Sequence, residues 1–376
     1  MMVQMTTKIF SNRHIYRRGG VGWLFTDGTE IIIVKKIQKQ EMSIELTKQK
    51  LDKIDEALYH LAKHETECKL CPRECKVDRK SGEKGFCEAV NQASLSHAIR
   101  HFGEEPVLSG MRDCAKEIGQ RSVLRSGSGT LFFSGCNLKC CFCQNYQISW
   151  LNHGQELTSG DLATHMIALQ NKGALNINFV SPSHILIPIL KALQKAYASG
   201  LHIPVVYNSN GYEKAEVIQY LDGIVDIYLP DCKYFSPQLS QTLSKASDYF
   251  LFASASLHEM YRQRPAFVRD DQDIAQKGLI IRHLVLPGQS EDSINILQWL
   301  AQNCRNGTAL SLMSQYKPCH KAPPNLQRSL EVEEYQIVVE KAIECGFKTV
   351  FIQPEPFKPE EHRIPDFERK NPFKWS

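Results

Sequence analysis

Three cysteines within one short stretch have the spacing of an iron–sulfur ligand set. Cys136, Cys140 and Cys143 form a C-x3-C-x2-C pattern directly after the apolar run at 131–133. Three thiolates can hold three irons of a cubane [4Fe–4S] cluster and leave the fourth iron without a protein ligand. An iron with an open position can bind a small molecule, as a catalytic zinc does. Residues 136–143, the cysteine loop, therefore indicate chemistry.

Two other interpretations of the cysteine loop stay open. Cys140 and Cys143 alone have the C-x-x-C spacing of a redox-active dithiol. They could also form half of a structural zinc site, although no second pair lies close downstream. Cys141 points in a different direction from its neighbour Cys140, so we take it as a non-ligand.

A second group of cysteines has the spacing of a four-ligand metal site. Cys68, Cys71, Cys75 and Cys87 follow a C-x2-C-x3-C-x11-C pattern in residues 68–87, the four-cysteine segment. Four thiolates close a tetrahedral site, and both zinc and a second iron–sulfur cluster accept such ligands. The sequence therefore predicts a metal site here without deciding between these metals.

The composition favours a cytoplasmic metal-binding protein. A chain of 376 residues can bury one large α/β domain or two smaller ones. The net charge of +4 gives no argument for nucleic acid or a membrane surface as a partner. Thirteen cysteines, most of them in two ligand-like groups, fit a reducing compartment better than a disulfide framework. The apolar run at 31–34 is too short to span a membrane.

The elements that must position the cysteine loop alternate between strands and helices. Strands are expected at 131–133, 177–180, 205–207, 225–229, 279–286, 310–313 and 350–352. Helices are expected at 44–64, 159–172, 185–199, 212–221, 248–262, 290–303 and 332–345. Repeated strand–helix units predict a parallel sheet with right-handed crossovers. Six or so units favour an α/β fold of the partial (β/α) barrel type, with an open doubly wound sheet as the alternative.

The chain is expected to comprise four regions. They are a peripheral extension at 1–41, a helix with the four-cysteine segment and a connecting loop at 42–126, the barrel at 127–357 and a tail at 358–376. Met42 is a candidate natural start. The stretch at 111–126 is either a lid or a sequence artefact.

The cysteine loop and its flanks resemble the radical S-adenosylmethionine (SAM) superfamily. Phe142 places an aromatic residue before the last cysteine of the motif. The run at 127–149 is similar to the uncharacterised homologues of pyruvate formate-lyase activating enzyme. Further similar blocks lie at 176–184, 204–212, 226–234, 281–288 and 312–318.

The resemblance implies a [4Fe–4S] cluster whose open iron binds SAM. A reductant such as flavodoxin or ferredoxin would supply one electron, and cleavage of SAM would give methionine and a 5′-deoxyadenosyl radical. This radical would abstract hydrogen from a glycine of a partner glycyl radical enzyme. Alternatives are a peptide, a cofactor precursor or RNA as the substrate, or a non-catalytic iron–sulfur or zinc protein that senses redox state or scaffolds a partner.

The resemblance also implies which residues meet SAM, although it singles out no catalytic residue. Asp231 and Lys233 resemble an Asp-x-Lys motif near SAM, and Arg282 could pair with the SAM carboxylate. The Ser-Pro-Ser-His run at 181–184 stands where many members have Gly-Gly-Glu for the SAM amino group. The candidate cofactor-binding residues are Phe142, Asn178, Ser181, Ser183, His184, Asn208, Asn210, Asp231, Lys233 and Arg282.

Overall fold

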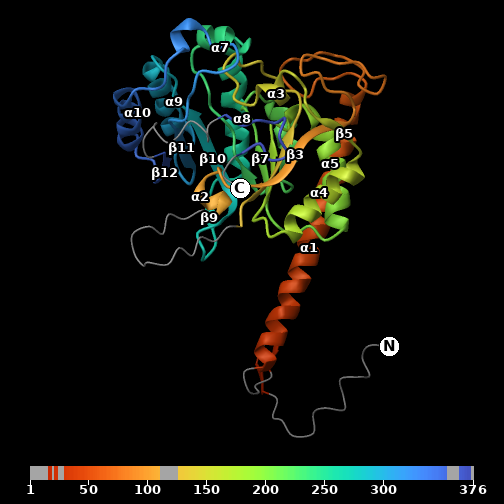
Figure 1. Cartoon of the computed structure of the whole chain (residues 1–376). Coiled ribbons are helices and arrows are strands. Elements are labelled where there is room, and N and C mark those ends of the chain that lie inside the picture. The colour runs from red at the N-terminus through yellow and green to blue at the C-terminus, as the bar shows by residue number, and fades with distance from the viewer. Residues whose placement is uncertain (1–15, 19–20, 24–28, 111–125, 354–363, 374–376) are drawn as a thin grey trace. The chain divides into compact units, whose positions relative to one another are not determined.

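The computed structural model describes residues 16–18, 21–23, 29–110, 126–353 and 364–373 (Figure 1). The chain divides into two compact units, Met1–Gln49 and Lys50–Ser376. The candidate lid at 111–126 falls outside the described residues except at residue 126, and the expected tail at 358–376 is described only at 364–373.

The first helix begins earlier than its sequence pattern predicts. α1 runs from Thr29 to Leu61, whereas the apolar spacing predicted a start near residue 44. The 3-10 helix η1 (Ala62–Glu65) continues it. In the second unit, Ile54, Ala57 and Leu61 are buried at intervals of three and four residues, so this part of α1 has an apolar face. In the first unit, β1 (Tyr16–Arg18) and β2 (Val21–Trp23) form an antiparallel pair.

Seven parallel strands run from one edge of a ten-stranded sheet in a mixed α/β fold. They are β4 (Ser128–Phe133), β6 (Ile177–Val180), β7 (Val205–Asn208), β8 (Ile227–Tyr228), β10 (Ala275–Leu284), β11 (Ala309–Met313) and β12 (Thr349–Ile352). Each pairs with the next of these strands along the chain. The order never reverses, whereas a doubly wound sheet reverses at a switch point. All seven strand predictions are therefore confirmed, and the doubly wound alternative is wrong.

Three further strands lie outside this parallel series. β3 (Ala93–His101) pairs antiparallel with β4, and β5 (Gln155–Leu157) pairs antiparallel with β3. β9 (Val268–Arg269) pairs antiparallel with β10. None of the three was expected from the sequence.

One face of the sheet packs against the long helices. These are α4 (Ser159–Asn171), α5 (Leu186–Ala198), α8 (Tyr249–Gln263), α9 (Ser290–Asn303) and α10 (Val332–Glu344). Alternate strand residues such as Phe133, Phe179 and Leu312 share a core with them, as expected from the two-residue period of a strand. The shorter helices are α2 (Pro106–Ser109), α3 (Tyr146–Ser149), α6 (Ala215–Ile218), α7 (Pro237–Ser244), η2 (Ser183–Ile185), η3 (Gln219–Leu221) and η4 (Pro324–Leu326).

A smaller core occupies the other face of the sheet. Val107 and Leu108 of α2 pack there against Val206, Ile227 and Ile280. Polar residues follow at the carboxyl ends of the same strands, where the loops of parallel strands meet at one edge. This edge is where the candidate site is built.

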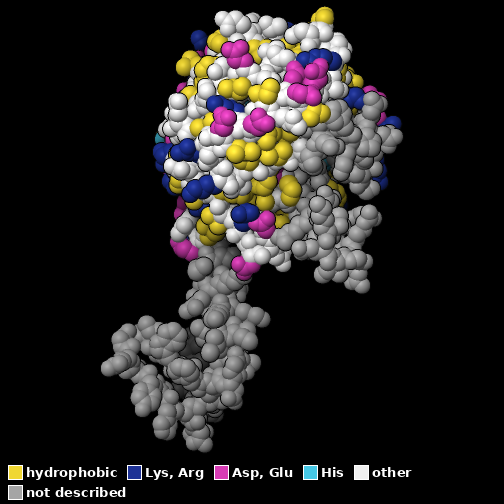
Figure 2. Space-filling view, turned by 90° about the vertical axis from the view of Figure 1, so that its left-hand side faces the viewer, with side chains coloured by type: hydrophobic (Ala, Val, Ile, Leu, Met, Phe, Trp, Pro, Cys, Tyr) yellow, Lys and Arg dark blue, Asp and Glu magenta, His cyan; other side chains and the backbone are white. Residues whose placement is uncertain are grey.

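The surface in Figure 2 is of mixed character, and the helices are those of a chain without a recognisable membrane span in its described part. On the face drawn in Figure 2, acidic and basic side chains are interspersed with hydrophobic ones. Among the described residues, no helix combines the length and the apolar character that crossing a membrane requires.

Candidate functional site

The cysteine loop begins just beyond β4, at the carboxyl edge of the sheet. Gly135 makes the turn into the loop with a φ of 82°. A Cβ at this position would lie 2.4 Å from the carbonyl oxygen of Cys87, so only glycine fits here without displacement. The amide of Gly135 donates to the carbonyl of Ile148 at 2.9 Å, which ties the start of the loop to α3.

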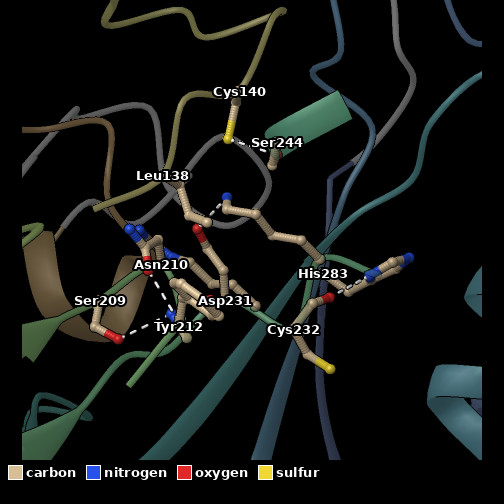
Figure 3. A network of polar contacts seen from close by, with 12 residues as sticks. Leu138, Cys140, Ser209, Asn210, Tyr212, Asp231, Cys232, Ser244 and His283 are labelled. Carbon is tan, nitrogen blue, oxygen red and sulfur yellow. Dashed lines mark hydrogen bonds and ion pairs between the residues drawn. The ribbon is translucent and has the colours of Figure 1, made fainter. Parts of the chain in front are cut away.

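Each of the three predicted cluster sulfurs contacts a polar side chain. The pairs are Cys136 with Asn210 at 3.3 Å, Cys140 with Ser244 at 3.0 Å and Cys143 with Ser149 at 3.2 Å. Figure 3 shows the contact between Cys140 and Ser244. Asn210 follows β7 and Ser244 ends α7, so residues far apart in the sequence converge on the sulfurs. A hydrogen bond donated to a sulfur favours its thiolate form.

The three sulfurs lie close enough to influence one another's ionisation. Burial, followed by the neighbouring Cys140 sulfur, raises the pKa of Cys136 and of Cys143 to about 12. Such thiols ionise together only where a cation takes up their charge, as a bound metal does. Burial therefore favours the neutral thiols, and a metal bound here would have to displace their protons.

An ion pair lies beside these sulfurs. Nζ of Lys233 is 2.5 Å from a carboxylate oxygen of Asp231, and both side chains are mostly buried. Burial alone would lower the pKa of Lys233, but Asp231 and the sulfurs of Cys140 and Cys143 raise it above its ordinary value. The two predicted residues are therefore together, with a positive charge close to the cysteine loop.

Tyr249 of α8 joins the strand ends that carry Asn210 and Asp231. Its hydroxyl lies 2.8 Å from the carbonyl oxygen of Asn210 and 2.9 Å from that of Asp231. The amide of Lys233 donates to the same hydroxyl at 3.0 Å. At Gly211, with a φ of 81°, a Cβ would lie 2.1 Å from the carbonyl oxygen of Asp231. Close backbone approach thus fixes these residues beside the cysteine loop.

A second polar group, the carboxylate–arginine layer, consists of Glu104, Glu105 and Arg282. The guanidinium of Arg282 donates to both carboxylate oxygens of Glu105, at 2.7 and 2.6 Å, and also pairs with Glu104. Asn178 donates to Glu104 at 2.9 Å, and Asn208 accepts from Arg282 at 3.5 Å. Three predicted cofactor-binding residues therefore meet here, through two glutamates that sequence reasoning missed.

In the carboxylate–arginine layer, the guanidinium of Arg282 is paired with two carboxylates of the chain itself. Burial would raise the pKa of Glu105, but the charge and hydrogen bonds of Arg282 lower it below its usual value. Both carboxylates that pair with Arg282 among the described residues belong to this chain. The pairing of Arg282 with a SAM carboxylate stays a prediction.

The residues predicted at 181–184 contact other parts of the chain. Ser181 has a positive φ of 53°. Ser183 donates to Glu213 at 2.5 Å, and burial raises the pKa of this glutamate to about 7. A ring nitrogen of His184 lies 2.8 Å from the carbonyl oxygen of Ser134, and burial lowers the pKa of the imidazole to about 4. His184 thus supports the entry to the cysteine loop.

Phe142 is a buried residue of the cysteine loop. Its ring packs edge-on against Tyr316, with ring centroids 5.7 Å apart. The Tyr316 hydroxyl donates to the carbonyl of Leu326 at 2.8 Å. The observed neighbour of Phe142 is thus an aromatic side chain, while its contact with a ligand stays a prediction.

The four-cysteine segment packs against the base of the cysteine loop. Cys68, Cys71 and Cys87 are buried and Cys75 is half-buried. Arg79 donates to the sulfur of Cys87 at 3.3 Å, and the amide of Phe86 donates to the sulfur of Cys75 at 3.3 Å. Burial raises the pKa of Cys87. Most partners of these sulfurs are close in the sequence.

Arg73 connects the four-cysteine segment to the cysteine loop. Its guanidinium donates to the carbonyl of Asn137 at 2.9 Å and to that of Lys245 at 2.5 Å. It also lies over the rings of Phe86, at 3.9 Å, and Tyr212, at 5.0 Å. A planar guanidinium can stack and donate at the same time, which a lysine ammonium cannot do.

The structure by itself assigns no metal to either cysteine group. Among the described residues, no three histidine, cysteine, aspartate or glutamate side chains are arranged to hold a single metal ion. Zinc in the four-cysteine segment therefore has no support here.

Comparison with known proteins places the chain in a family. No protein-family model matches it. The uncharacterized protein MJ0674 of Methanocaldococcus jannaschii is 32% identical over 293 residues, which cover 75% of this chain and 74% of that protein. The chain belongs to the same family as MJ0674.

Several solved structures resemble the chain at low identity. SuiB of Streptococcus suis bound to S-adenosylmethionine is 12% identical, with a TM-score of 0.38 over 58% of this chain and 48% of SuiB. anSMEcpe with bound AdoMet is 13% identical, with a TM-score of 0.39 over 58% of this chain and 61% of anSMEcpe. A chitinase catalytic domain from Pyrococcus furiosus is 13% identical, with a TM-score of 0.30 over 52% of this chain and 69% of that domain. The chain thus spans less than two thirds of SuiB and of anSMEcpe.

Proposed function

We propose that this protein is a cytoplasmic radical SAM enzyme that carries a [4Fe–4S] cluster on Cys136, Cys140 and Cys143. The observation that carries the proposal is the convergence of three cysteine sulfurs, each with a polar partner, at the carboxyl edge of a parallel sheet. In a cubane, each cysteine binds a different iron, so the sulfurs need to surround a volume instead of meeting at one point.

The chain's own residues would hold and orient the reacting groups. Asn210 and Ser244 would keep the sulfurs of Cys136 and Cys140 in place through their hydrogen bonds. The ammonium of Lys233 would offset part of the negative charge of the thiolates, and Asp231 would orient that ammonium. When bound, the cluster and SAM would supply reductive cleavage to methionine and a 5′-deoxyadenosyl radical that abstracts hydrogen.

We also propose that the sheet is a partial (β/α) barrel. Seven parallel strands in chain order and helices on one face support this arrangement. On the other face, α2 fills the amino-terminal side with apolar residues, and the carboxylate–arginine layer follows. Active sites of barrels lie at the carboxyl ends of their strands, where the cysteine loop is.

The four-cysteine segment is proposed as a second metal site that supports the cysteine loop. Its contacts with Gly135 and Asn137 lie at the base of the loop. Zinc or a second iron–sulfur cluster would satisfy its four thiols. Metal analysis of the purified protein and of a Cys75→Ala variant distinguishes the two, because only the iron–sulfur alternative changes the iron-to-chain ratio.

For the substrate, we propose a glycine of a partner glycyl radical enzyme. The support is the resemblance of the segments around 127–149 and 226–234 to homologues of an activating enzyme. The reconstituted protein would be mixed with SAM, a reductant and a glycyl radical enzyme from the same organism. A protein-centred radical in the electron paramagnetic resonance (EPR) spectrum is expected. Release of 5′-deoxyadenosine without such a radical would redirect the search to a peptide, cofactor precursor or RNA.

The enzyme class is tested by anaerobic reconstitution with iron and sulfide, followed by dithionite and SAM. The expected product is 5′-deoxyadenosine, measured by liquid chromatography and mass spectrometry. Cys136→Ala should reduce its formation to background. Cys141→Ala is the matched control, because the Cys141 sulfur is half-buried and belongs to neither proposed ligand set. Equal product from both variants, or none from the unaltered protein with a complete cluster, would reject the proposal.

A further inference from the structure

The segments around the cysteine loop carry basic side chains and no carboxylates. Residues 126–155, 232–247 and 308–330 contain no aspartate or glutamate, yet they contain Lys139, Lys245 and Lys321. Elsewhere, as on the face drawn in Figure 2, acidic and basic side chains are interspersed. These three segments therefore carry charge of one sign, and the nearby carboxylate of Asp231 is paired with Lys233.

The three lysines gather around one aromatic ring. Nζ lies 5.4 Å from the Trp150 ring centroid for Lys139, 5.7 Å for Lys245 and 4.8 Å for Lys321. All three distances are within the range of a cation–π contact. Lys245 and Lys321 are exposed. In the part of the chain that the structure describes, no ion pair joins any of these three ammonium groups to a carboxylate.

This lysine–tryptophan patch, formed by Lys139, Trp150, Lys245 and Lys321, is attached directly to the cysteine loop. The indole N–H of Trp150 donates to the carbonyl of Cys140 at 3.1 Å. The amide of Lys321 donates to the carbonyl of Cys141 at 2.8 Å. A partner that covers the patch would therefore lie next to the backbone of a proposed cluster ligand.

We propose that the lysine–tryptophan patch is the docking surface for an acidic one-electron donor protein that reduces the group held by the cysteine loop. The inference rests on the proposed function, which requires one electron for each cleavage of SAM. The donor, a small flavin or iron–sulfur protein, loses this electron and the cluster gains it. Three like charges that have no carboxylate partner among the described residues favour an acidic partner, because its carboxylates relieve their mutual repulsion.

The patch suits a protein better than a nucleic acid. Nucleic-acid binding usually extends along a basic stripe that contacts several phosphates. Here three lysines surround a single ring, and the chain as a whole has a net charge of only +4. The area is compact and contains an aromatic residue of the kind enriched in protein interfaces.

Direct binding tests this inference without any activity readout. Oxidised flavodoxin would be titrated against the full chain by isothermal calorimetry at low and at moderate salt. The triple variant Lys139→Gln, Lys245→Gln, Lys321→Gln is expected to weaken binding by about tenfold or more and to reduce its salt dependence. The control carries Lys172→Gln, Lys195→Gln and Lys348→Gln, three exposed lysines elsewhere, and should bind within about twofold of the unaltered chain.

The possible outcomes separate this inference from the proposed function. The triple variant should keep its thermal melting temperature. The double variant Lys245→Gln, Lys321→Gln, which leaves the cysteine loop unaltered, should also keep its dithionite-driven release of 5′-deoxyadenosine, since dithionite needs no docking surface. If the unaltered protein releases no 5′-deoxyadenosine with dithionite, the proposed function fails. The calorimetric result still decides whether the lysine–tryptophan patch binds an acidic partner. Equal loss of affinity in both triple variants, no flavodoxin binding by the unaltered chain, or binding of a single-stranded RNA oligomer in its place would overturn the inference.

Discussion

The two cysteine groups differ in where their partners come from. In the four-cysteine segment, Cys75 and Cys87 receive hydrogen bonds from Phe86 and Arg79, which belong to the same segment. In the cysteine loop, Cys140 contacts Ser244, which is 104 residues further along the chain. In the cysteine loop, Cys143 has a local partner in Ser149, whereas Cys136 and Cys140 have partners from distant elements. The cysteine loop therefore depends more on the tertiary fold than the four-cysteine segment does.

The largest expected effect separates the roles of the two groups. Cys136→Ala should abolish SAM cleavage, because it removes a proposed cluster ligand, whereas folded Cys75→Ala protein should retain cleavage. The measurement is 5′-deoxyadenosine per folded chain, with folding checked by circular dichroism. If Cys75→Ala is as inactive as Cys136→Ala while fully folded, the supporting role of the four-cysteine segment is wrong.

The next largest effect concerns the carboxylate–arginine layer, which is also assembled from distant residues and in which the chain itself supplies both carboxylate partners of Arg282. Glu105→Gln should destabilise the protein by about 1.5–3 kcal/mol, because it removes the charge from one of the two carboxylates that pair with the mostly buried Arg282. Iron loading of the folded variant should be unchanged. Urea unfolding and iron analysis check both points, and a loss of iron without loss of stability would contradict this assignment.

The lowered pKa of Glu105 predicts that the stability of the protein depends on pH. Arg282 lowers the pKa of Glu105 in the folded state. The stabilisation is therefore present above the ordinary glutamate pKa of about 4.3 and is lost as the pH falls through the lower folded value. Unfolding curves between neutral and acidic pH should show a smaller loss of stability in Glu105→Gln than in the unaltered protein.

A smaller effect tests the contact between the two cysteine groups. Gly135→Ala should destabilise the protein more than Gly173→Ala, by about 1–3 kcal/mol. Both glycines have a positive φ, of 82° and 83°. Only Gly135 has a backbone atom where a Cβ would be, since nothing lies within 4 Å at Gly173. Equal unfolding midpoints for the two variants would mean that close packing between Gly135 and the four-cysteine segment does not contribute to stability.

The smallest effect concerns Arg73, which links the two groups. Arg73→Lys should cost about 1–2 kcal/mol, because lysine keeps the charge but loses the stacking on Phe86 and the forked hydrogen bonds. Arg305→Lys, at an exposed arginine with one backbone acceptor, is the control and should change stability by less than about 0.5 kcal/mol. Chemical denaturation of both variants measures the difference.

Much of the fold followed from apolar runs and helical periodicity. The expected strand at 177–180 and the expected helix at 290–303 have the observed bounds. β5 and β9 were missed because their residues are mostly polar or exposed and their pairing depends on neighbours. The early start of α1 was missed because the apolar spacing becomes regular only later in the helix.

The candidate site was predictable only in part, because its contacts join distant parts of the chain. Strand ends indicated Asn210, Asp231 and Lys233, and the structure brings these residues to the cysteine loop. Ser244 and Tyr249 lie in helical segments whose patterns carry no signal for the site. The pair Glu104 and Glu105 precedes a proline in what reads as an ordinary polar connection, and its partner Arg282 is 178 residues beyond Glu104.

The central claim is that the cysteine loop holds an iron cluster with one open iron that binds SAM. The most direct test is the EPR spectrum of the anaerobically reconstituted and reduced protein, recorded before and after SAM is added. A [4Fe–4S] signal whose g-values change on addition of SAM, and which is missing from Cys136→Ala but present in Cys141→Ala, is the predicted result. A protein that contains only zinc, or a cluster signal that SAM leaves unchanged, would contradict the account.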